Sequence, residues 1–305
     1  MANTKSQHNI NLNIYSNSIM KINVYKVLQA PSIILLLLWM IVPLGMTIYF
    51  SFQRYHLLYP ERSGFVGLSN YDFFLTDPAL GVSVLNTLTL VGGVILISVI
   101  LGLGISLLLQ EAFRGRGIIR ILLISPFFIM PTVNALIWKN MFMNPIYGLF
   151  AYVSGIFGLP IVNWIAELPL LSIIIMLSWQ WTPFALLIFM TSLQSMDQEQ
   201  VEAAEIEGAG FWSKFRYLTL PHLGRAIGVV VMIQAIFHLG VFAEIYVTTG
   251  GGPGHESTNT TWLIFKQALL GFDVGVASAG GVFAIIIANI IAFFLIKTVA
   301  KGMGK

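Results

Sequence analysis

The chain of 305 residues contains no cysteine and very little charge. Without cysteine it cannot form a disulfide, a thiolate metal site or a cysteine nucleophile. Only 10% of its residues are charged, whereas a typical soluble domain has about 25%. Hydrophobic residues make up 57% of the chain, and the mean hydropathy is +0.83. This composition predicts an integral membrane protein.

The motifs of nucleotide-binding and catalytic proteins are also missing. A P-loop ends in Gly-Lys-Ser/Thr, but the two Lys-Ser/Thr pairs of this chain, Lys5-Ser6 and Lys297-Thr298, follow no glycine loop. His255-Glu256 lacks the second histidine of a zinc-protease helix, and no Ser/His/Asp arrangement stands out. We therefore expect no catalytic residue, metal site or cofactor on this chain, and no nucleic-acid partner. If ATP drives its function, a separate subunit must bind the nucleotide.

Six stretches are long and apolar enough to cross a bilayer as helices. About 20 helical residues, each rising about 1.5 Å, span the hydrocarbon core. The stretches are continuously apolar, which favours helices over the alternating strands of a barrel. They cover residues 30–50, 87–109, 118–138, 168–191, 226–247 and 276–300. The sequence thus predicts an all-α integral membrane domain over residues 30–305, preceded by a polar, loosely patterned tail over residues 1–29.

The basic residues are divided unevenly between the two sides of these six spans. Twelve of the sixteen lysines and arginines fall on the side that holds both termini and residues 192–225. The other side has only Arg54, Arg62, Lys139 and Lys266. Because basic loops stay in the cytoplasm, both termini and the loop over residues 195–222 are expected to be cytoplasmic.

The loop over residues 195–222 is charged and has a helical pattern. Its apolar residues recur every three or four positions, which predicts an amphipathic helical segment, and they are Val201, Ala204, Gly208, Phe211, Phe215 and Leu218. One interpretation is a solvated surface helix. The other is a docking element, because aromatic side chains on a short cytoplasmic helix need to be buried against the span ends or a partner.

Local signals predict how this loop begins, bends and ends. Ser195 followed by Gln198 has the spacing of a capping box. Gly208 and Gly210 interrupt the helical pattern and predict a bend between two short helices. Pro221 is expected to end the segment.

The same loop resembles the EAA loop of ABC-transporter permeases. The similar residues are Glu202-Ala203-Ala204, then Gly208 after three residues, then Leu218-Thr219-Leu220-Pro221 after nine more. The family often has isoleucine in place of Leu218, and many relatives have Ile-Pro where this chain has Met196-Asp197. Further similarity to carbohydrate-type permeases lies in residues 65–71 and 248–254, and residues 272–281 are most similar to permeases for polyols such as sorbitol and mannitol.

The resemblance implies a type I ABC importer permease fold in a bacterial inner membrane. It also implies a second permease forming a heterodimer, two ATPase subunits that hold ATP and Mg²⁺, and a periplasmic solute-binding protein. The solute would be a polyol, or alternatively a disaccharide or glycerol phosphate. The loop would couple ATPase closure to the membrane through Glu202, Ala203, Ala204, Gly208, Leu218, Leu220 and Pro221.

Polar side chains within the predicted fifth span require an explanation. An ionisable group at the bilayer centre costs about 2.5–3.5 kcal/mol on insertion scales. Gln234 and His238 share one face of a helix, and Glu244 lies about 80° from Gln234 on the same helical wheel. Either these residues line a hydrophilic cavity for hydroxyl groups, or His238 bonds a neighbouring carbonyl and Glu244 extends to the membrane interface.

Other spans contain further candidates for the same cavity. Trp179, Gln180 and Trp181 fall near the middle of the fourth span, away from the interface where tryptophan usually lies. They either pack within the bundle or stack on a sugar. In the third span Pro126 and Pro131 predict a break near Asn134. In the sixth span Asn289 is either an interhelical hydrogen-bonding group or part of the cavity.

Two other classes of membrane protein fit parts of this sequence. An ion-coupled secondary transporter would show coupling acids or arginines deep in the spans and paired inverted repeats, and neither is clear here. A membrane scaffold or sensor component would have no solute path at all.

Overall fold

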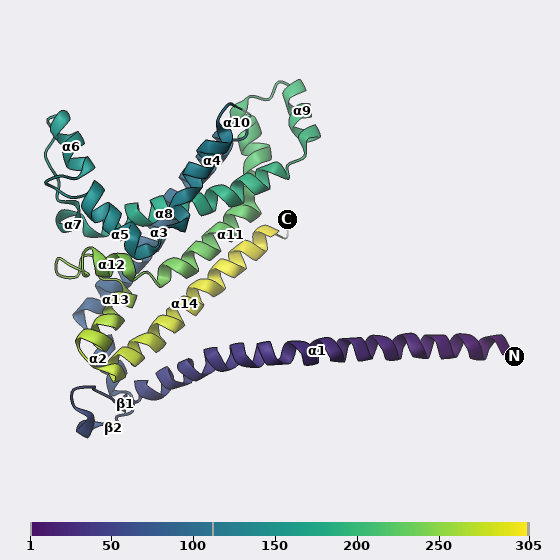
Figure 1. Cartoon of the computed structure of the whole chain (residues 1–305), viewed down its shortest axis with the longest axis horizontal. Coiled ribbons are helices and arrows are strands. Elements are labelled where there is room, and N and C mark those ends of the chain that lie inside the picture. The colour runs from purple at the N-terminus through teal and green to yellow at the C-terminus, as the bar shows by residue number, and fades with distance from the viewer. Residues whose placement is uncertain (1, 112, 304–305) are drawn as a thin grey trace.

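The computed structural model describes the backbone of residues 2–111 and 113–303, and the side chains of residues 26–111, 113–294 and 297. The regular secondary structure in this part of the chain consists of helices and one small antiparallel hairpin (Figure 1). The hairpin joins β1 (Gln53–Arg54) to β2 (Gly64–Phe65), with Gln53 opposite Phe65.

Five helical stretches in the described residues are long and apolar enough to cross a membrane. They are Lys26–Ser51 within α1 (Ala2–Ser51), α3 (Pro78–Leu108), α8 (Pro169–Gln194), Phe211–Leu239, and Val274–Phe294 within α14 (Val274–Met303). The bent pair Arg116–Phe128 and Pro131–Phe142 makes a sixth crossing if it is counted as one span. The all-α membrane fold is therefore as predicted. The backbone of the expected tail, from Ala2 onward, is helical and continuous with the first span.

The third crossing is broken where the prolines predict. It consists of α4 (Arg116–Ile124), the 3₁₀ turn η2 (Ser125–Phe128), α5 (Pro131–Ile137) and the π-helical turn η3 (Trp138–Phe142). Met130 precedes Pro131 and has extended backbone angles, φ −61° and ψ 141°. A residue before proline is pushed out of the helical region, so the chain turns here by 107°.

The fifth crossing differs from the prediction at both ends. Pro221 does not end the coupling segment, because α10 (Phe211–Lys214), the π-helical turn η4 (Phe215–Thr219) and α11 (Leu220–Leu239) form one continuous helix. In η4 the hydrogen bonds shift register, and Leu220 N–H donates to the Phe215 carbonyl. The missing N–H of Pro221 therefore falls where the α-helical ladder is already interrupted.

The predicted span over residues 226–247 is also not one helix. α11 ends at Leu239, and α12 (Ala243–Val247) begins only after Gly240 and Phe242, which has φ −143° and ψ −50°. The 80° relation between Gln234 and Glu244 therefore does not apply, because the two residues lie on different helices. The crossing thus has a break of its own, close to the break in the third crossing.

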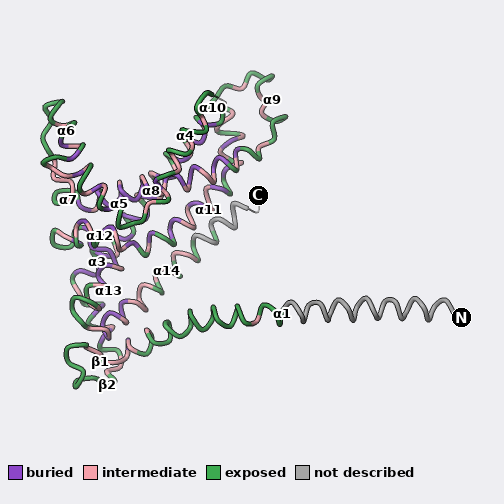
Figure 2. The backbone as a smooth tube through the Cα atoms, in the orientation of Figure 1, coloured by how far each residue is buried: buried purple, intermediate pink, exposed green. Residues whose placement is uncertain are grey.

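The core lies where α3, α8 and α11 pack together. Leu90, Val94, Ile173 and Leu177 are fully buried there. A Cβ atom at Gly102 would lie 2.8 Å from the Cβ of Ala185, so α3 and α8 approach as closely as small residues allow. In contrast, most of the described part of α1 is exposed, and only its C-terminal end near Ser51 is buried (Figure 2).

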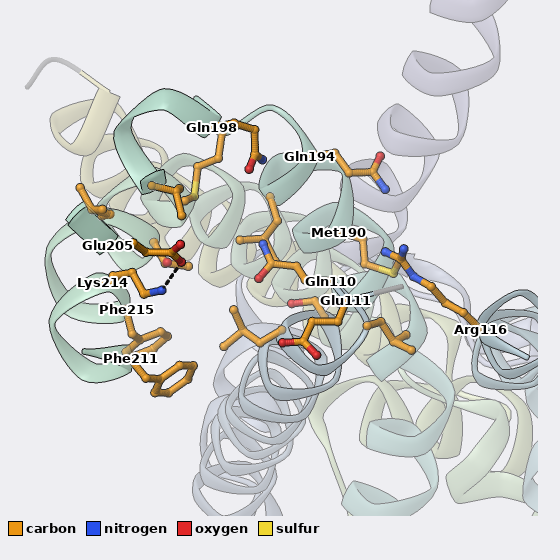
Figure 3. A pocket seen from close by; sticks show the side chains of 18 of the residues that line it. Gln110, Glu111, Arg116, Met190, Gln194, Gln198, Glu205, Phe211, Lys214 and Phe215 are labelled. Carbon is orange, nitrogen blue, oxygen red and sulfur yellow. Dashed lines mark hydrogen bonds and ion pairs between the residues drawn. The ribbon is translucent and has the colours of Figure 1, made fainter. Parts of the chain in front are cut away.

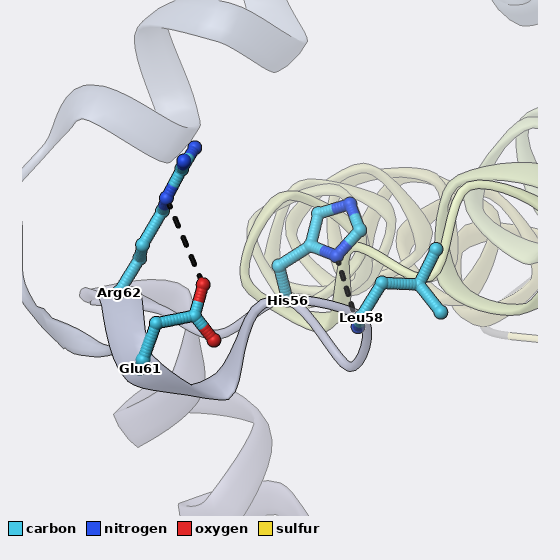
Figure 4. A network of polar contacts seen from close by, with 4 residues as sticks. All are labelled: His56, Leu58, Glu61 and Arg62. Carbon is cyan, nitrogen blue, oxygen red and sulfur yellow. Dashed lines mark hydrogen bonds and ion pairs between the residues drawn. The ribbon is translucent and has the colours of Figure 1, made fainter.

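Short elements cover the end of the bundle opposite the 195–222 loop. They are η1 (Pro60–Arg62), α2 (Ser69–Leu75), α6 (Leu149–Ile156), α7 (Trp164–Glu167), α13 (Thr260–Phe265) and the π-helical turn η5 (Lys266–Leu270). The hairpin is anchored to the start of α14, because the N–H groups of Val274 and Gly275 both donate to the Tyr55 carbonyl. The connection between its strands also reaches this segment, because Leu57 N–H donates to the Phe272 carbonyl at 2.8 Å. Local contacts add to this: Leu58 N–H donates to His56 Nδ1, and Arg62 pairs with Glu61 (Figure 4).

Candidate functional site

A cavity of about 630 Å³ lies beside the breaks in the third and fifth crossings. It is bordered by η2, the start of α5, α8, the end of α11 and the start of α12. Its lining is mainly aromatic and aliphatic with a few polar groups, and consists of Phe127, Ile129, Pro131, Leu177, Gln180, Trp181, Phe184, Ile233, Phe237, His238, Gly240, Val241, Phe242, Ala243 and Glu244. Such a mixture is typical of small-molecule sites.

Trp181 is the centre of the aromatic wall of this cavity. Its ring centroid lies 5.6 Å from that of Phe127, 5.8 Å from that of Phe184 and 5.2 Å from that of Phe237. The aromatic rings come from η2, α8 and α11, so three crossings contribute to one wall. An apolar wall of this kind suits the C–H face of a sugar or polyol.

His238 lies against Trp181 with a ring-centroid distance of 4.8 Å and is almost fully buried. Its Nδ1 is 2.7 Å from the backbone carbonyl of Gln234. A carbonyl oxygen only accepts, so Nδ1 must carry the proton, and in the neutral ring Nε2 is an acceptor. Nε2 is buried and has no hydrogen-bond partner among the described residues. It is therefore an unsatisfied acceptor on a residue that lines the cavity.

Gln234 lies behind this wall and does not line the cavity. Its side chain is fully buried, accepts a 2.7 Å hydrogen bond from the Ser98 hydroxyl, and donates weakly, at 3.5 Å, to the Trp181 carbonyl. The residue therefore fixes α11 against α3 and α8. Gln234 was expected to line the cavity together with His238, but the structure places it behind the cavity wall.

Gln180 and Asn134 brace the break in the third crossing. The Asn134 amide donates to Gln180 Oε1 at 2.9 Å, and Gln180 Nε2 donates to the Ile129 carbonyl at 2.5 Å. Ile129 is at the end of η2, where the helix stops before Pro131. Gln180 thus satisfies a carbonyl that the break has freed, as irregular backbone at membrane depth requires. Gln180 also reaches the cavity lining, whereas Asn134 does not.

Glu244 is the one charged residue among those that line the cavity. It is 4% exposed, and no ion pair of its carboxylate occurs among the described residues. The helix that carries it is held from outside the cavity by Lys139, whose Nζ donates to the carbonyls of Val247 at 2.9 Å and Thr248 at 3.4 Å. A lysine at the C-terminal end of α12 is favourable for the carbonyl groups there.

Two of the predicted cavity residues lie elsewhere. Trp179 points away from Trp181 and packs on Trp138, with a centroid distance of 5.8 Å. Asn289 is on an exposed face of α14, where its amide donates to the Ile285 carbonyl. The structure therefore brings Gln180, Trp181, His238 and Glu244 together at the cavity, with Gln234 and Asn134 behind them.

The loop over residues 195–222 forms a second candidate site at the other end of the molecule. It contains α9 (Gln198–Ile206), a turn at Gly208, and then α10. The predicted bend is present, since Gly208 has φ +81°. The predicted capping box at Ser195 is wrong. Asp197 caps α9 instead, and its carboxylate accepts a hydrogen bond from Glu199 N–H. The reason is that the chain leaves α8 in a turn at Ser195 and becomes helical again only after Asp197.

Two contacts hold this loop in shape. Lys214 pairs with Glu205 at 2.6 Å and ties α10 to α9 across the Gly208 turn (Figure 3). His222 Nε2 lies 2.8 Å from the Ser192 carbonyl and joins the two ends of the loop at the membrane. Between the loop and the α3–α4 connection is a cleft of about 430 Å³ (Figure 3).

Aromatic side chains at the start of α10 are exposed within this chain. Phe211 is 61% exposed and Trp212 is 75% exposed, while Phe215 is only partly exposed. The three rings contact one another, with centroid distances of 5.6–6.3 Å. The residues by which the loop resembles the EAA loop differ in burial. Four are exposed, namely Glu202, Ala203, Gly208 and Pro221, and three are half-buried, namely Ala204, Leu218 and Leu220. The span ends of this chain therefore do not bury Phe211 and Trp212.

Several residues of these sites were not singled out in the sequence. Phe127, Phe184 and Phe237 are ordinary members of apolar runs, and only the folded chain brings them to one wall. The proximity of Phe127 to the break at Pro131 was the one available signal. Lys139 and His222 act on backbone carbonyls of distant segments, so no spacing rule could find their partners.

Comparisons with known proteins show the family to which the chain is similar. A family described as "Binding-protein-dependent transport system inner membrane component" matches residues 94–305. The trehalose/maltose transport system permease protein MalF of Thermococcus litoralis is 35% identical over 252 residues, covering 82% of this chain and 84% of that protein. The trehalose transport system permease protein SugA of Mycobacterium tuberculosis is 28% identical over 271 residues, covering 88% and 86%.

The solved structures show the same architecture. A chain from the crystal structure of a bacterial ABC transporter involved in the import of the acidic polysaccharide alginate matches with a TM-score of 0.78. The match is 20% identical and covers 93% of this chain and 98% of that chain. The shared fold includes the crossings that carry the cavity and the loop.

Proposed function

The chain belongs to the family of binding-protein-dependent transport system inner membrane components, and from this premise we propose that it moves a sugar or sugar alcohol by alternating access. As a member of the family it is a non-catalytic, multi-pass permease subunit of a carbohydrate-type ABC importer. Permeases of this family hold no cofactor of their own. The alternatives of an ion-coupled transporter and of a scaffold without a solute path do not fit this membership.

The coupling loop carries the proposal for energy transfer. Its rings at Phe211 and Trp212 are exposed on a loop that the Glu205–Lys214 pair and the His222 contact hold in one shape. A rigid element with exposed aromatic residues suits a groove on another protein. We assign that groove to an ATPase subunit, one of two that bind ATP and Mg²⁺, and place the loop and both termini in the cytoplasm.

A second permease subunit is proposed because this chain leaves most of its first span uncovered. The span Lys26–Ser51 has none of its central residues buried within the chain. A span that packs so little against its own chain is unusual in a transporter, where spans pack against one another. A second permease would cover α1 and supply the remaining wall of the cavity, and a periplasmic binding protein would deliver the solute to the opposite end from the coupling loop.

The cavity carries the proposal for the solute. Trp181 presents a broad aromatic face, Gln180 and His238 present polar groups, and Glu244 lies beside them. Carbohydrates combine C–H faces with hydroxyl groups, so this lining suits them. We propose a polyol such as sorbitol or mannitol, since residues 272–281 are most similar to polyol permeases, with a disaccharide such as trehalose or maltose as the second candidate because of the related permeases.

Uptake by the assembled transporter in proteoliposomes tests this proposal. ATP-dependent accumulation of labelled sorbitol, mannitol, trehalose or maltose, with the matching binding protein present, is the expected result. Accumulation that survives removal of ATP and stops when the proton gradient collapses would contradict it. Trp179→Phe serves as a control because that ring lies outside the cavity.

A further inference from the structure

The cavity carries a charge of one sign. Its fifteen lining residues include the acid Glu244 and no lysine or arginine. Lys139 holds the same helix from outside the cavity, and its Nζ donates to two carbonyls at the far end of α12. No ion pair of Glu244 occurs among the described side chains.

The position of Glu244 makes its charge effective. The side chain is 4% exposed and lies next to apolar walls from α8 and α11, so little water screens it. At an effective dielectric constant of about 20, two like charges about 6 Å apart repel enough to weaken binding about a hundredfold. Burying a carboxylate with no cation beside it costs free energy of folding. An unpaired acid at membrane depth therefore indicates a functional role.

We infer that Glu244 is a specificity-determining residue that makes this cavity reject anionic carbohydrates and accept neutral or cationic ones. The inference rests on the proposed solute path and makes it narrower: of the solutes considered above, it favours polyols and neutral disaccharides and excludes glycerol phosphate. The inference also predicts that the solute charge accepted by this chain differs from that accepted by the matched transporter, which is involved in the import of the acidic polysaccharide alginate.

Three probes of one size separate charge from shape. Sorbitol is neutral, gluconate is its carboxylate counterpart and glucamine is its ammonium counterpart, and each has six carbons. Maltose and maltobionate form a second neutral and acidic pair. Binding is measured by calorimetry on the assembled permease and ATPase complex without binding protein, so that only the membrane cavity is tested.

The expected result is that the wild-type complex binds the neutral member of each pair about a hundredfold more tightly than the acid, as the Coulomb argument gives. Glucamine is expected to bind at least as tightly as sorbitol. Glu244→Gln should bring the three affinities close together, and Glu244→Asp, which keeps the charge, should retain the order. Glu167→Gln is the matched control, because Glu167 is an exposed acid on α7 that does not line the cavity.

Two outcomes overturn the inference, and they differ in what else they affect. If Glu244→Gln keeps the wild-type order of affinities, the charge of Glu244 does not select the solute, while the cavity itself stands. If the wild-type complex binds none of the five probes, the proposed solute cavity fails together with the inference. Size-exclusion chromatography of each variant shows whether the complex is intact before binding is measured.

Discussion

Replacing Gly208 with leucine tests the mechanical role of the coupling loop. Gly208 has φ +81°, in the left-handed region that ordinary residues avoid. The turn there is closed by hydrogen bonds from Gly208 N–H to the Glu205 carbonyl at 3.0 Å and from Ala209 N–H to the Ala204 carbonyl at 2.9 Å. We expect Gly208→Leu to assemble in the membrane but to transport poorly.

The size of the effect follows from the geometry. A Cβ at position 208 would meet no described atom within 4 Å, so the substitution causes no clash inside this chain. The remaining cost is the left-handed backbone, about 1–2 kcal/mol for an L-residue. That cost lowers the ratio of native to open loops by roughly 5–30-fold. Contact of the leucine with an ATPase groove would add to the loss.

The assay is solute uptake together with solute-stimulated ATP hydrolysis in proteoliposomes. Gly210→Ala is the matched control, because Gly210 has φ −69° and ψ 170°, which any residue adopts, and its Cβ would also meet no described atom within 4 Å. We expect this control to behave like the wild type. Gly208→Asn should fall between the two, since asparagine tolerates the left-handed region. Wild-type uptake and ATPase stimulation in Gly208→Leu would refute the reasoning.

Three further substitutions follow from particular contacts. His222→Ala should lower the amount of solute moved per ATP, because it removes the contact that ties the loop to the Ser192 carbonyl. His222→Gln should restore this ratio, since its amide can donate to the same carbonyl. Equal ratios in the wild type and both variants would contradict a coupling role for His222. Gly102→Val should lower the thermal midpoint of the purified complex, because overpacking at the 2.8 Å approach to Ala185 costs about 1–3 kcal/mol, whereas Gly104→Val, with open space around it, should not. Trp181→Ala should raise the KM of uptake through loss of the aromatic wall, and an unchanged KM would remove Trp181 from the solute path.

Hydrophobic length was enough to predict the crossings, because the bilayer requires about 20 apolar residues whatever their partners are. The break in the third crossing was predictable as well, since Pro131 restricts Met130 locally. The break in the fifth crossing was not. Gly240 is the one local sign of it, and an isolated glycine inside an apolar run has several other meanings.

Within the coupling loop, the sequence predicted the bend but not the ends. Ser195 and Asp197 are both good N-cap residues, and the choice depends on how the chain leaves α8. Pro221 is a helix terminator by propensity, but the π-helical turn before it lets the helix continue. Each of these outcomes depends on packing between segments, which local patterns do not contain.

Local sequence patterns were also insufficient to predict which polar and aromatic residues line the cavity. Trp179 and Trp181 are two positions apart and therefore lie on opposite faces of α8, so only one of them can reach a given site. The sequence supports either choice. Asn289 and His238 are equally polar, but α14 turns Asn289 outward and α11 turns His238 toward the cavity.

The central claim is that the coupling loop docks on an ATP-hydrolysing subunit, and a single-cysteine crosslink tests it most directly. The chain has no cysteine, so Ser213→Cys, exposed on α10 beside Trp212, introduces one reactive site, and Ser63→Cys places the control at the opposite end of the molecule. In the native assembly, a short bifunctional reagent should join position 213, but not position 63, to the ATPase subunit. If position 213 never yields that product while the assembly remains intact and active, the loop is not the coupling element.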